Sequence, residues 1–144
     1  MNKVHQILKI KGQQVWRVSK DATVLDALQM MGEKQISSVI VMDGEQIAGI
    51  FTERDFAQKV GVRNVPPSSV KVAEVMSPDL ITVDLETSVN QCMSIITNSR
   101  IRHLPVMENG ELVGIISIGD VVKDVIEELQ FMVSQLENYV MNFR

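Results

Sequence analysis

The sequence is poor in cysteine, in aromatic residues and in long apolar runs, and each shortage excludes a class of protein. Its single cysteine, Cys92, cannot form an intrachain disulfide, and no Cys/His cluster accompanies it, so we expect neither a disulfide scaffold nor a metal site. No apolar stretch reaches the roughly 18 residues of a membrane-spanning helix, and the N-terminus is too polar for a signal peptide. We therefore expect a cytoplasmic protein.

Basic residues are also few, because 14 Lys and Arg stand against 18 Asp and Glu, which gives a net charge of −4. No block of Lys or Arg is present to neutralise a phosphate backbone, so we expect no nucleic-acid partner. The acidic balance likewise argues against a membrane partner. With aromatic residues at 4%, the core of these 144 residues must be aliphatic, built from Val, Ile, Leu and the nine Met.

The chain contains an internal repeat. Shifting the sequence by 65 places aligns Val18–Val60 with Val83–Val125 without a gap and with nine identities. Each copy has a helical apolar pattern after a Ser or Thr cap, then two short strands joined by a turn, then a second helix. With a first strand before each helix, placed at Ile81–Val83 in the second copy, the order is β-α-β-β-α. We therefore predict a mixed α+β fold of two such units, related by a pseudo-twofold axis.

The expected organisation follows from this repeat. Residues 1–62 form the first unit and include a short N-terminal helix in "VHQILKIKG" that stops at Gly12. Residues 63–71 contain Pro66-Pro67 and form a linker. Residues 72–125 form the second unit, and residues 126–144 extend its last helix. A long amphipathic C-terminal helix of this kind needs an apolar partner, and a symmetric homodimer is the expected one.

The motif that recurs is Gly-Ile, a hydroxyl residue, and an Asp three places later. It occurs as "GIFTERDF" and again as "GIISIGDV", where the hydroxyl residues are Thr52 and Ser117 and the carboxylates are Asp55 and Asp120. A Ser or Thr with an acid three residues on is a capping box, which is a purely structural feature. The first turn of a helix also offers free N–H groups and a positive dipole end to phosphate. Both roles can coexist.

The same residues resemble a known family. "VIVMDGEQIAGIFTERDF" and "VMSPD…ITV…IRHLPVMENGELVGIISIGDVV" are similar to CBS domains in tandem, the arrangement called a Bateman module, from about Val15 to Val125. The resemblance implies a stand-alone regulatory module of bacterial or archaeal type that binds AMP, ADP or ATP, with AMP the expected ligand, in clefts between its units. NAD and S-adenosylmethionine are alternative ligands. The adenine nucleotide is a ligand here and not a catalytic cofactor.

In this family each ligand is held by the Asp of one unit and by residues of the other. The resemblance therefore implies a main cleft of Thr52, Arg54, Asp55, Thr82, Arg102, His103 and Pro105. Two arginines and a histidine would make it a strong phosphate site. The second cleft, implied to be weaker because it has little positive charge, consists of Ser19, Ser37, Ser38, Ser117 and Asp120.

Two residues depart from the expected pattern of the sites, and two alternative functions stay open. Ile40 stands where the second unit has Pro105, and Glu53 adds an acid beside the expected phosphate site. The clefts could be vestigial, which would leave a structural dimerisation module or scaffold. An enzyme is the other alternative, but no nucleophile–base pair or paired carboxylates can be argued, so we expect no catalysis.

Overall fold

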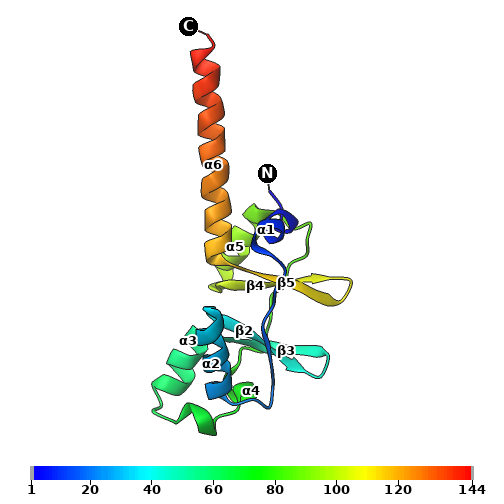
Figure 1. Ribbon diagram of the computed structural model, residues 1–144, viewed down its shortest axis with the longest axis vertical. Coiled ribbons are helices and arrows are strands. Elements are labelled where there is room, and N and C mark those ends of the chain that lie inside the picture. The colour runs from blue at the N-terminus through cyan, green and yellow to red at the C-terminus, as the bar shows by residue number, and fades with distance from the viewer. Residues whose placement is uncertain (1, 144) are drawn as a thin grey trace. The chain divides into compact units, whose positions relative to one another are not determined.

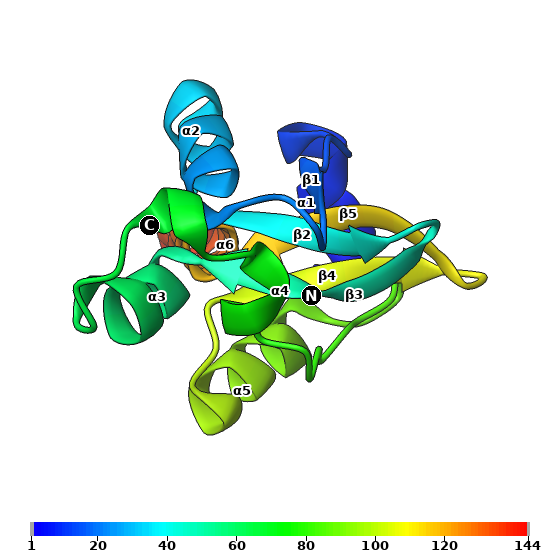
Figure 2. The same cartoon turned by 90° about the horizontal axis from the view of Figure 1, so that it is seen from below.

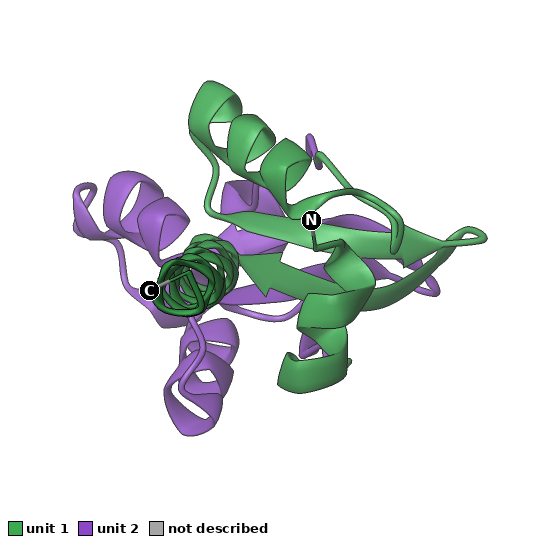
Figure 3. Cartoon of the chain, turned by 90° about the horizontal axis from the view of Figure 1, so that it is seen from above, with its two compact units in different colours: residues 1–14, 81–144 green, residues 15–80 purple. Residues whose placement is uncertain are grey.

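The computed structural model describes residues 2–143 and divides into two compact units (Figures 1 and 3). Unit 2 is residues 15–80, and unit 1 is residues 1–14 together with residues 81–144. Each unit contains one long β-hairpin (Figure 2). The mixed α+β class and the two repeated units predicted from the sequence are confirmed.

Unit 2 is built on a three-stranded sheet in which β1 lies parallel to β2, and β2 lies antiparallel to β3. Its elements, in chain order, are β1 Arg17–Ser19, α2 Val24–Lys34, β2 Ser38–Asp43, β3 Gln46–Thr52, α3 Glu53–Phe56, the π-helix η1 Ala57–Gly61, the 3-10 helix η2 Pro67–Ser69 and α4 Val72–Val75.

Unit 1 repeats the hairpin and ends in a much longer helix, which extends beyond the other elements of its unit (Figure 1). Its elements are α1 Val4–Lys11, α5 Val89–Ser99, β4 His103–Glu108, β5 Glu111–Ser117 and α6 Ile118–Met141. The antiparallel register of β4 and β5 matches that of β2 and β3, including an irregularity at the same point of each hairpin.

Each unit has its own aliphatic core, as the scarcity of aromatic residues predicts. The core of unit 1 includes Leu8, Leu104 and Ile116. Phe51 is the largest fully buried side chain in the core of unit 2. Trp16 packs against that core and lies under the Lys34 ammonium group, 4.3 Å from the ring centroid.

Local sequence signals account for the helix starts and the hairpin turns. Thr23 and Ser88 cap α2 and α5 with complete capping boxes, as predicted. Asn109 and Gly110 join β4 to β5 with φ values of +52° and +81°, the conformation that an Asn-Gly hairpin turn supplies. The predicted N-terminal helix ends at Gly12, whose φ is +98°.

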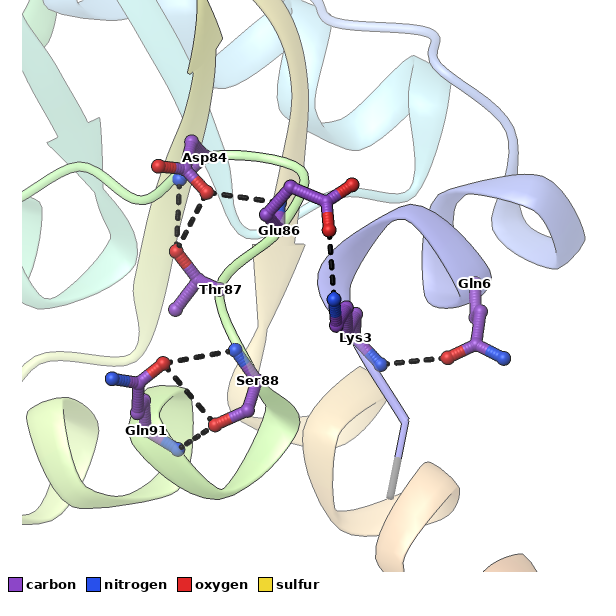
Figure 4. Close-up of polar contacts among 7 residues, drawn as sticks. All are labelled: Lys3, Gln6, Asp84, Glu86, Thr87, Ser88 and Gln91. Carbon is purple, nitrogen blue, oxygen red and sulfur yellow. Dashed lines mark hydrogen bonds and ion pairs between the residues drawn. The ribbon is translucent and has the colours of Figure 1, made fainter.

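The compact units divide the chain differently from the boundaries expected from the sequence. Residues 1–14 were expected to belong with the first repeat, but they pack in unit 1 with the second repeat. The reason is a backbone pairing next to α1, in which Lys3 forms a bridge with Ser88 and the N–H of Val4 donates to the carbonyl of Thr87 at 2.9 Å. The Lys3 ammonium group also contacts Glu86 at 2.8 Å (Figure 4).

The strand expected at Ile81–Val83 is reduced to a bridge between Val83 and Val106. The chain turns immediately afterwards, because the Asp84 carboxylate accepts hydrogen bonds from the N–H of Glu86 and the hydroxyl of Thr87 (Figure 4).

Candidate functional site

Two equivalent corners, where a strand runs into a helix, carry the residues predicted to bind a ligand. In unit 2 the corner joins β3 to α3, and the Asp55 carboxylate oxygen Oδ2 accepts hydrogen bonds from the N–H and the hydroxyl of Thr52 at 3.0 and 3.1 Å. In unit 1 the corner joins β5 to α6, and Oδ2 of Asp120 accepts from the N–H and the hydroxyl of Ser117 at 2.8 and 3.0 Å. Both corners are complete capping boxes, so the structural role considered for this motif is present.

The Asp55 carboxylate is buried and uses both of its oxygens. Besides the two bonds to Oδ2, Oδ1 accepts from the Ser77 hydroxyl at 2.9 Å and pairs with the Lys59 ammonium group at 3.0 Å. Its side chain is only 8% exposed. A ligand that hydrogen-bonds to Asp55 must therefore displace one of these donors.

The Asp120 carboxylate has a different set of partners. The Lys11 ammonium group donates to the same oxygen, Oδ2, at 2.6 Å and also to the carbonyl of Ile115 at 2.9 Å. Among residues 2–143, no donor bonds to Oδ1, and the side chain is 24% exposed. Burial alone would raise the pKa of Asp120, but hydrogen bonds from Lys11 and Ser117 and the charge of Lys11 outweigh it and lower that pKa. Asp120 is thus an ionised acceptor with one oxygen open.

His103 and Arg102 lie beside the Asp120 corner within unit 1. His103 is paired with Ser117 across the β4–β5 hairpin, and the carbonyl of Arg102 accepts from the N–H of Ile118 at 2.8 Å. Burial, followed by the charge of Lys11, lowers the pKa of His103. His103 therefore carries less positive charge at pH 7 than an ordinary histidine does.

The corresponding residues of unit 2 carry hydroxyl groups instead. Ser38 is buried and paired with Thr52, and the carbonyl of Ser37 accepts from the N–H of Glu53 at 3.1 Å. Ser19 ends β1 and caps the following turn, since its hydroxyl accepts from the N–H of Asp21. Arg54 is exposed in the first turn of α3.

Each of the two predicted clefts is therefore divided between the units, and each unit holds part of both residue sets. Arg102, His103, Ser117 and Asp120 share unit 1, together with exposed Thr82 and buried Pro105. Thr52, Arg54 and Asp55 share unit 2 with Ser19, Ser37 and Ser38. The pairing of Asp55 with Arg102 and His103, which the family resemblance implies, joins residues of separate units and stays a prediction.

The glycine that both copies of the motif share has a structural explanation inside each unit. A Cβ at Gly49 would lie 2.6 Å from the carbonyl oxygen of Ser77, which pairs with β3 there. A Cβ at Gly114 would lie 2.8 Å from the side chain of Leu8 in α1. The close approach expected at these positions is therefore made by neighbouring protein segments in the structure.

Sequence reasoning missed three partners of the two carboxylates, namely Lys11, Lys59 and Ser77. The repeat indicates that two of these segments are equivalent, because the shift of 65 places that relates the two copies also relates Gly12, next to Lys11, to Ser77. Residues 1–14 therefore complete unit 1 as the segment around Ser77 completes unit 2. Lys59 lies four residues after Asp55, which is an ordinary helical ion-pair spacing.

Two further findings concern metal-ligating side chains and membrane-spanning helices. Within residues 2–143, no group of three His, Cys, Asp or Glu side chains is arranged to hold a metal ion. None of the described helices combines the length and the apolar content needed to cross a lipid bilayer.

Two repeated units, each with a hairpin that leads into a capped helix and a carboxylate at its first turn, define a tandem module with two equivalent corners. The model of the CBS domain family matches residues 11–61 and 72–127, so this chain belongs to the CBS domain family and carries two CBS repeats. It is a tandem CBS-domain protein of the signal-transduction or regulatory kind.

Relatives of several kinds share this architecture. The mitochondrial CBS domain-containing protein CBSX3 of Arabidopsis thaliana is 37% identical over 95% of this chain and 71% of its own length. A CBS-domain protein of Burkholderia ambifaria, described as a signal-transduction protein, is 43% identical with a TM-score of 0.85, over 88% of this chain and 95% of its own. The hexameric CBS-CP12 protein from bloom-forming cyanobacteria is 30% identical with a TM-score of 0.76, over 85% of this chain and 70% of its own.

Proposed function

We propose that this chain is a non-catalytic sensor that binds an adenine nucleotide, with AMP the expected ligand, and acts as a homodimer. The observation that supports this most is a carboxylate fixed by a capping box at the start of a helix in both CBS units. A rigid carboxylate can accept hydrogen bonds from both hydroxyls of a ribose, and the adjoining N–H groups of the helix favour phosphate.

Asp120 fits this role through its geometry. One of its oxygens has no donor among residues 2–143, and Lys11 supplies a positive charge 2.6 Å from the other. Arg102 and His103 lie beside this corner within unit 1, but the family resemblance assigns them to the site of Asp55. A ribose could therefore bond to the open oxygen without breaking the capping box.

Asp55 is proposed as the acceptor of the main site, as the charge distribution of the sequence predicts. Its two oxygens already accept four hydrogen bonds or ion pairs, so a ribose must replace Ser77 or Lys59 at Oδ1. Lys59 is the weaker of the two, because its ammonium group is partly exposed and regains water when it leaves.

The saturation of Asp55 also favours a second candidate function, a structural dimerisation module whose nucleotide sites are vestigial. A buried carboxylate that ties β3, α3 and Ser77 together needs no ligand to explain it. NAD and S-adenosylmethionine are alternative ligands of the sensor. The cytoplasmic location stays a prediction, and the Arabidopsis relative is named as a mitochondrial protein.

Mass spectrometry of the small molecules that co-purify with the protein tests the sensor directly. The sensor predicts an adenine-containing compound, which dialysis removes and calorimetric titration with AMP, ADP, ATP, NAD or S-adenosylmethionine replaces. The structural dimerisation module predicts that no such compound co-purifies. It also predicts neither heat nor a thermal shift with any of these five ligands.

A further inference from the structure

The second half of α6 leaves most of its apolar side chains in solvent. Seventeen large apolar side chains are exposed in the described chain, and ten of them lie at or beyond Ile126. Their exposed fractions run from 48% to 74%. These ten are Ile126, Leu129, Phe131, Met132, Val133, Leu136, Tyr139, Val140, Met141 and Phe143.

Their spacing is that of a coiled coil. Apolar residues recur along α6 and up to Phe143, two residues beyond it, at alternating intervals of four and three residues, which places them at the a and d positions of a heptad. The eight residues of this seam are Ile118, Val122, Val125, Leu129, Met132, Leu136, Tyr139 and Phe143. A seam sustained at a period of 3.5 residues matches another helix along its whole length, whereas a helix that packs only on its own domain needs no such regularity.

The two flanks of this seam differ in polarity. On one flank, at the e positions, lie Ile126, Val133 and Val140. On the other flank, at the g positions, lie Glu128, Gln135 and Asn142. The helix therefore presents an apolar seam with one apolar and one polar margin.

We propose that α6 pairs with α6 of a second copy of this chain in the antiparallel direction. In an antiparallel pair the two-fold axis crosses both helices, so e positions meet e positions and g positions meet g positions. Val133 then meets Val133 of the second copy, and Gln135 meets Gln135 of the second copy. In a parallel pair e positions meet g positions, which would place the apolar Val133 against Glu128. The opposed helix dipoles also favour the antiparallel pair.

The register follows from the lengths available. When Met132 faces Leu136 of the second copy, Leu129 faces Tyr139 and Val125 faces Phe143. This register uses residues 125–143, a span of about 28 Å at 1.5 Å per residue. It also covers the last exposed residues of the helix.

A second copy suits this face better than other occupants do. At roughly 100 Å² for each half-exposed large side chain, the apolar residues of the seam and its margin supply close to the ~800 Å² per partner of a stable interface. The charge argues against an anionic membrane, because Asp124 to Phe143 contains three Glu and one Asp and no Lys or Arg. The heptad seam is complementary to itself, which is what a two-fold pair requires.

This inference deepens the homodimer of the proposed function and does not depend on ligand binding. Analytical ultracentrifugation of the full chain, of Leu136→Glu and of Ser134→Glu tests it. Leu136 lies in the seam and Ser134 on the opposite face of α6, so both variants add the same charge to the same helix.

We expect the wild type and Ser134→Glu to be dimers with dissociation constants within about threefold of each other. Leu136→Glu should weaken the dimer at least about 100-fold, since it places a charge in the seam. Circular dichroism must show all three folded. A monomeric or hexameric wild type, or a Leu136→Glu dimer of unchanged affinity, would overturn the pairing. Calorimetry with AMP on the same variants reports separately on the sensor.

The direction of pairing is tested by oxidative cross-linking of variants that each carry one added cysteine. Leu129→Cys and Tyr139→Cys should form little disulfide-linked dimer when each is alone, and much when the two are mixed and allowed to exchange subunits. The native Cys92 is buried and does not interfere. Efficient self-cross-linking of Tyr139→Cys with no gain on mixing would show a parallel pair and overturn the proposed direction.

Discussion

Truncation of Asp55 to alanine should destabilise unit 2 far more than the equivalent truncation of Asp120 destabilises unit 1. Asp55→Ala removes the acceptor of hydrogen bonds from Thr52 and Ser77 and of the ion pair with Lys59, in a site where the carboxylate is 8% exposed. Loss of a helix cap costs about 1 kcal/mol. Buried donors that lose a charged acceptor add about 2 kcal/mol.

The expected loss in the free energy of unfolding for Asp55→Ala is therefore about 3 kcal/mol. The Lys59 ion pair is left out of this sum because the Lys59 side chain is partly exposed. Asp120→Ala also loses a cap, but Asp120 is more exposed and, among residues 2–143, accepts no hydrogen bond equivalent to that of Ser77 with Asp55. We expect about 1.5 kcal/mol there. The two variants should therefore differ by about 1.5 kcal/mol.

Urea denaturation measures both losses. Trp16 is the only tryptophan and packs on the core of unit 2, so its fluorescence reports the unfolding of that unit. Far-UV circular dichroism reports the helices of both units, and the larger share of them lies in α1, α5 and α6 of unit 1. The reasoning is refuted when the free energies of unfolding of Asp55→Ala and Asp120→Ala agree within about 0.5 kcal/mol, or when Asp120→Ala is the less stable protein.

Three further predictions concern packing and ionisation. Gly49→Ala should lower the free energy of unfolding by about 2–3 kcal/mol, because its Cβ would lie 2.6 Å from a backbone oxygen. Gly114→Ala should lower it less, because its Cβ meets only a flexible side chain. Equal urea midpoints for the two variants would contradict this difference. The Cys92 thiol, whose pKa burial raises to about 11, should react with a disulfide reagent at pH 8 only when unit 1 opens, and rapid reaction in the folded protein would contradict it. The lowered pKa of Asp120 contributes stability that is present above pH ~4 and is lost as the pH falls below it. Lys11→Met should therefore lose less stability than the wild type between about pH 4.5 and 3, as measured by urea midpoints. An equal dependence of the midpoint on pH in the two proteins would show that the ion pair adds nothing.

Much of the fold could be predicted because its signals are local and occur twice. The repeat fixes the order of elements in each CBS unit, and the Thr23 and Ser88 capping boxes mark the starts of α2 and α5. The Asn109-Gly110 turn marks one hairpin. The amphipathic pattern of the C-terminal residues predicts the long helix α6.

The assignment of α1 to a unit could not be predicted, because an amphipathic helix fits either core equally well. What decides it is the pairing of Lys3 with Ser88, a contact between residues far apart in the chain. The same limit applies to the site. The capping boxes are readable from spacing, but the contacts of Lys11 with Asp120 and of Ser77 with Asp55 arise only when distant segments meet.

The central claim is that the two corner carboxylates bind the sugar of an adenine nucleotide. Calorimetric titration of AMP into ligand-free wild type, Asp55→Asn and Asp120→Asn, all shown to be folded, tests it most directly. We predict saturable binding by the wild type, a loss of affinity on the order of 10–100-fold at the site that carries each substitution, and the larger effect in Asp55→Asn. Binding that both substitutions leave unchanged, or a ligand-free wild type that binds no AMP, would contradict the claim.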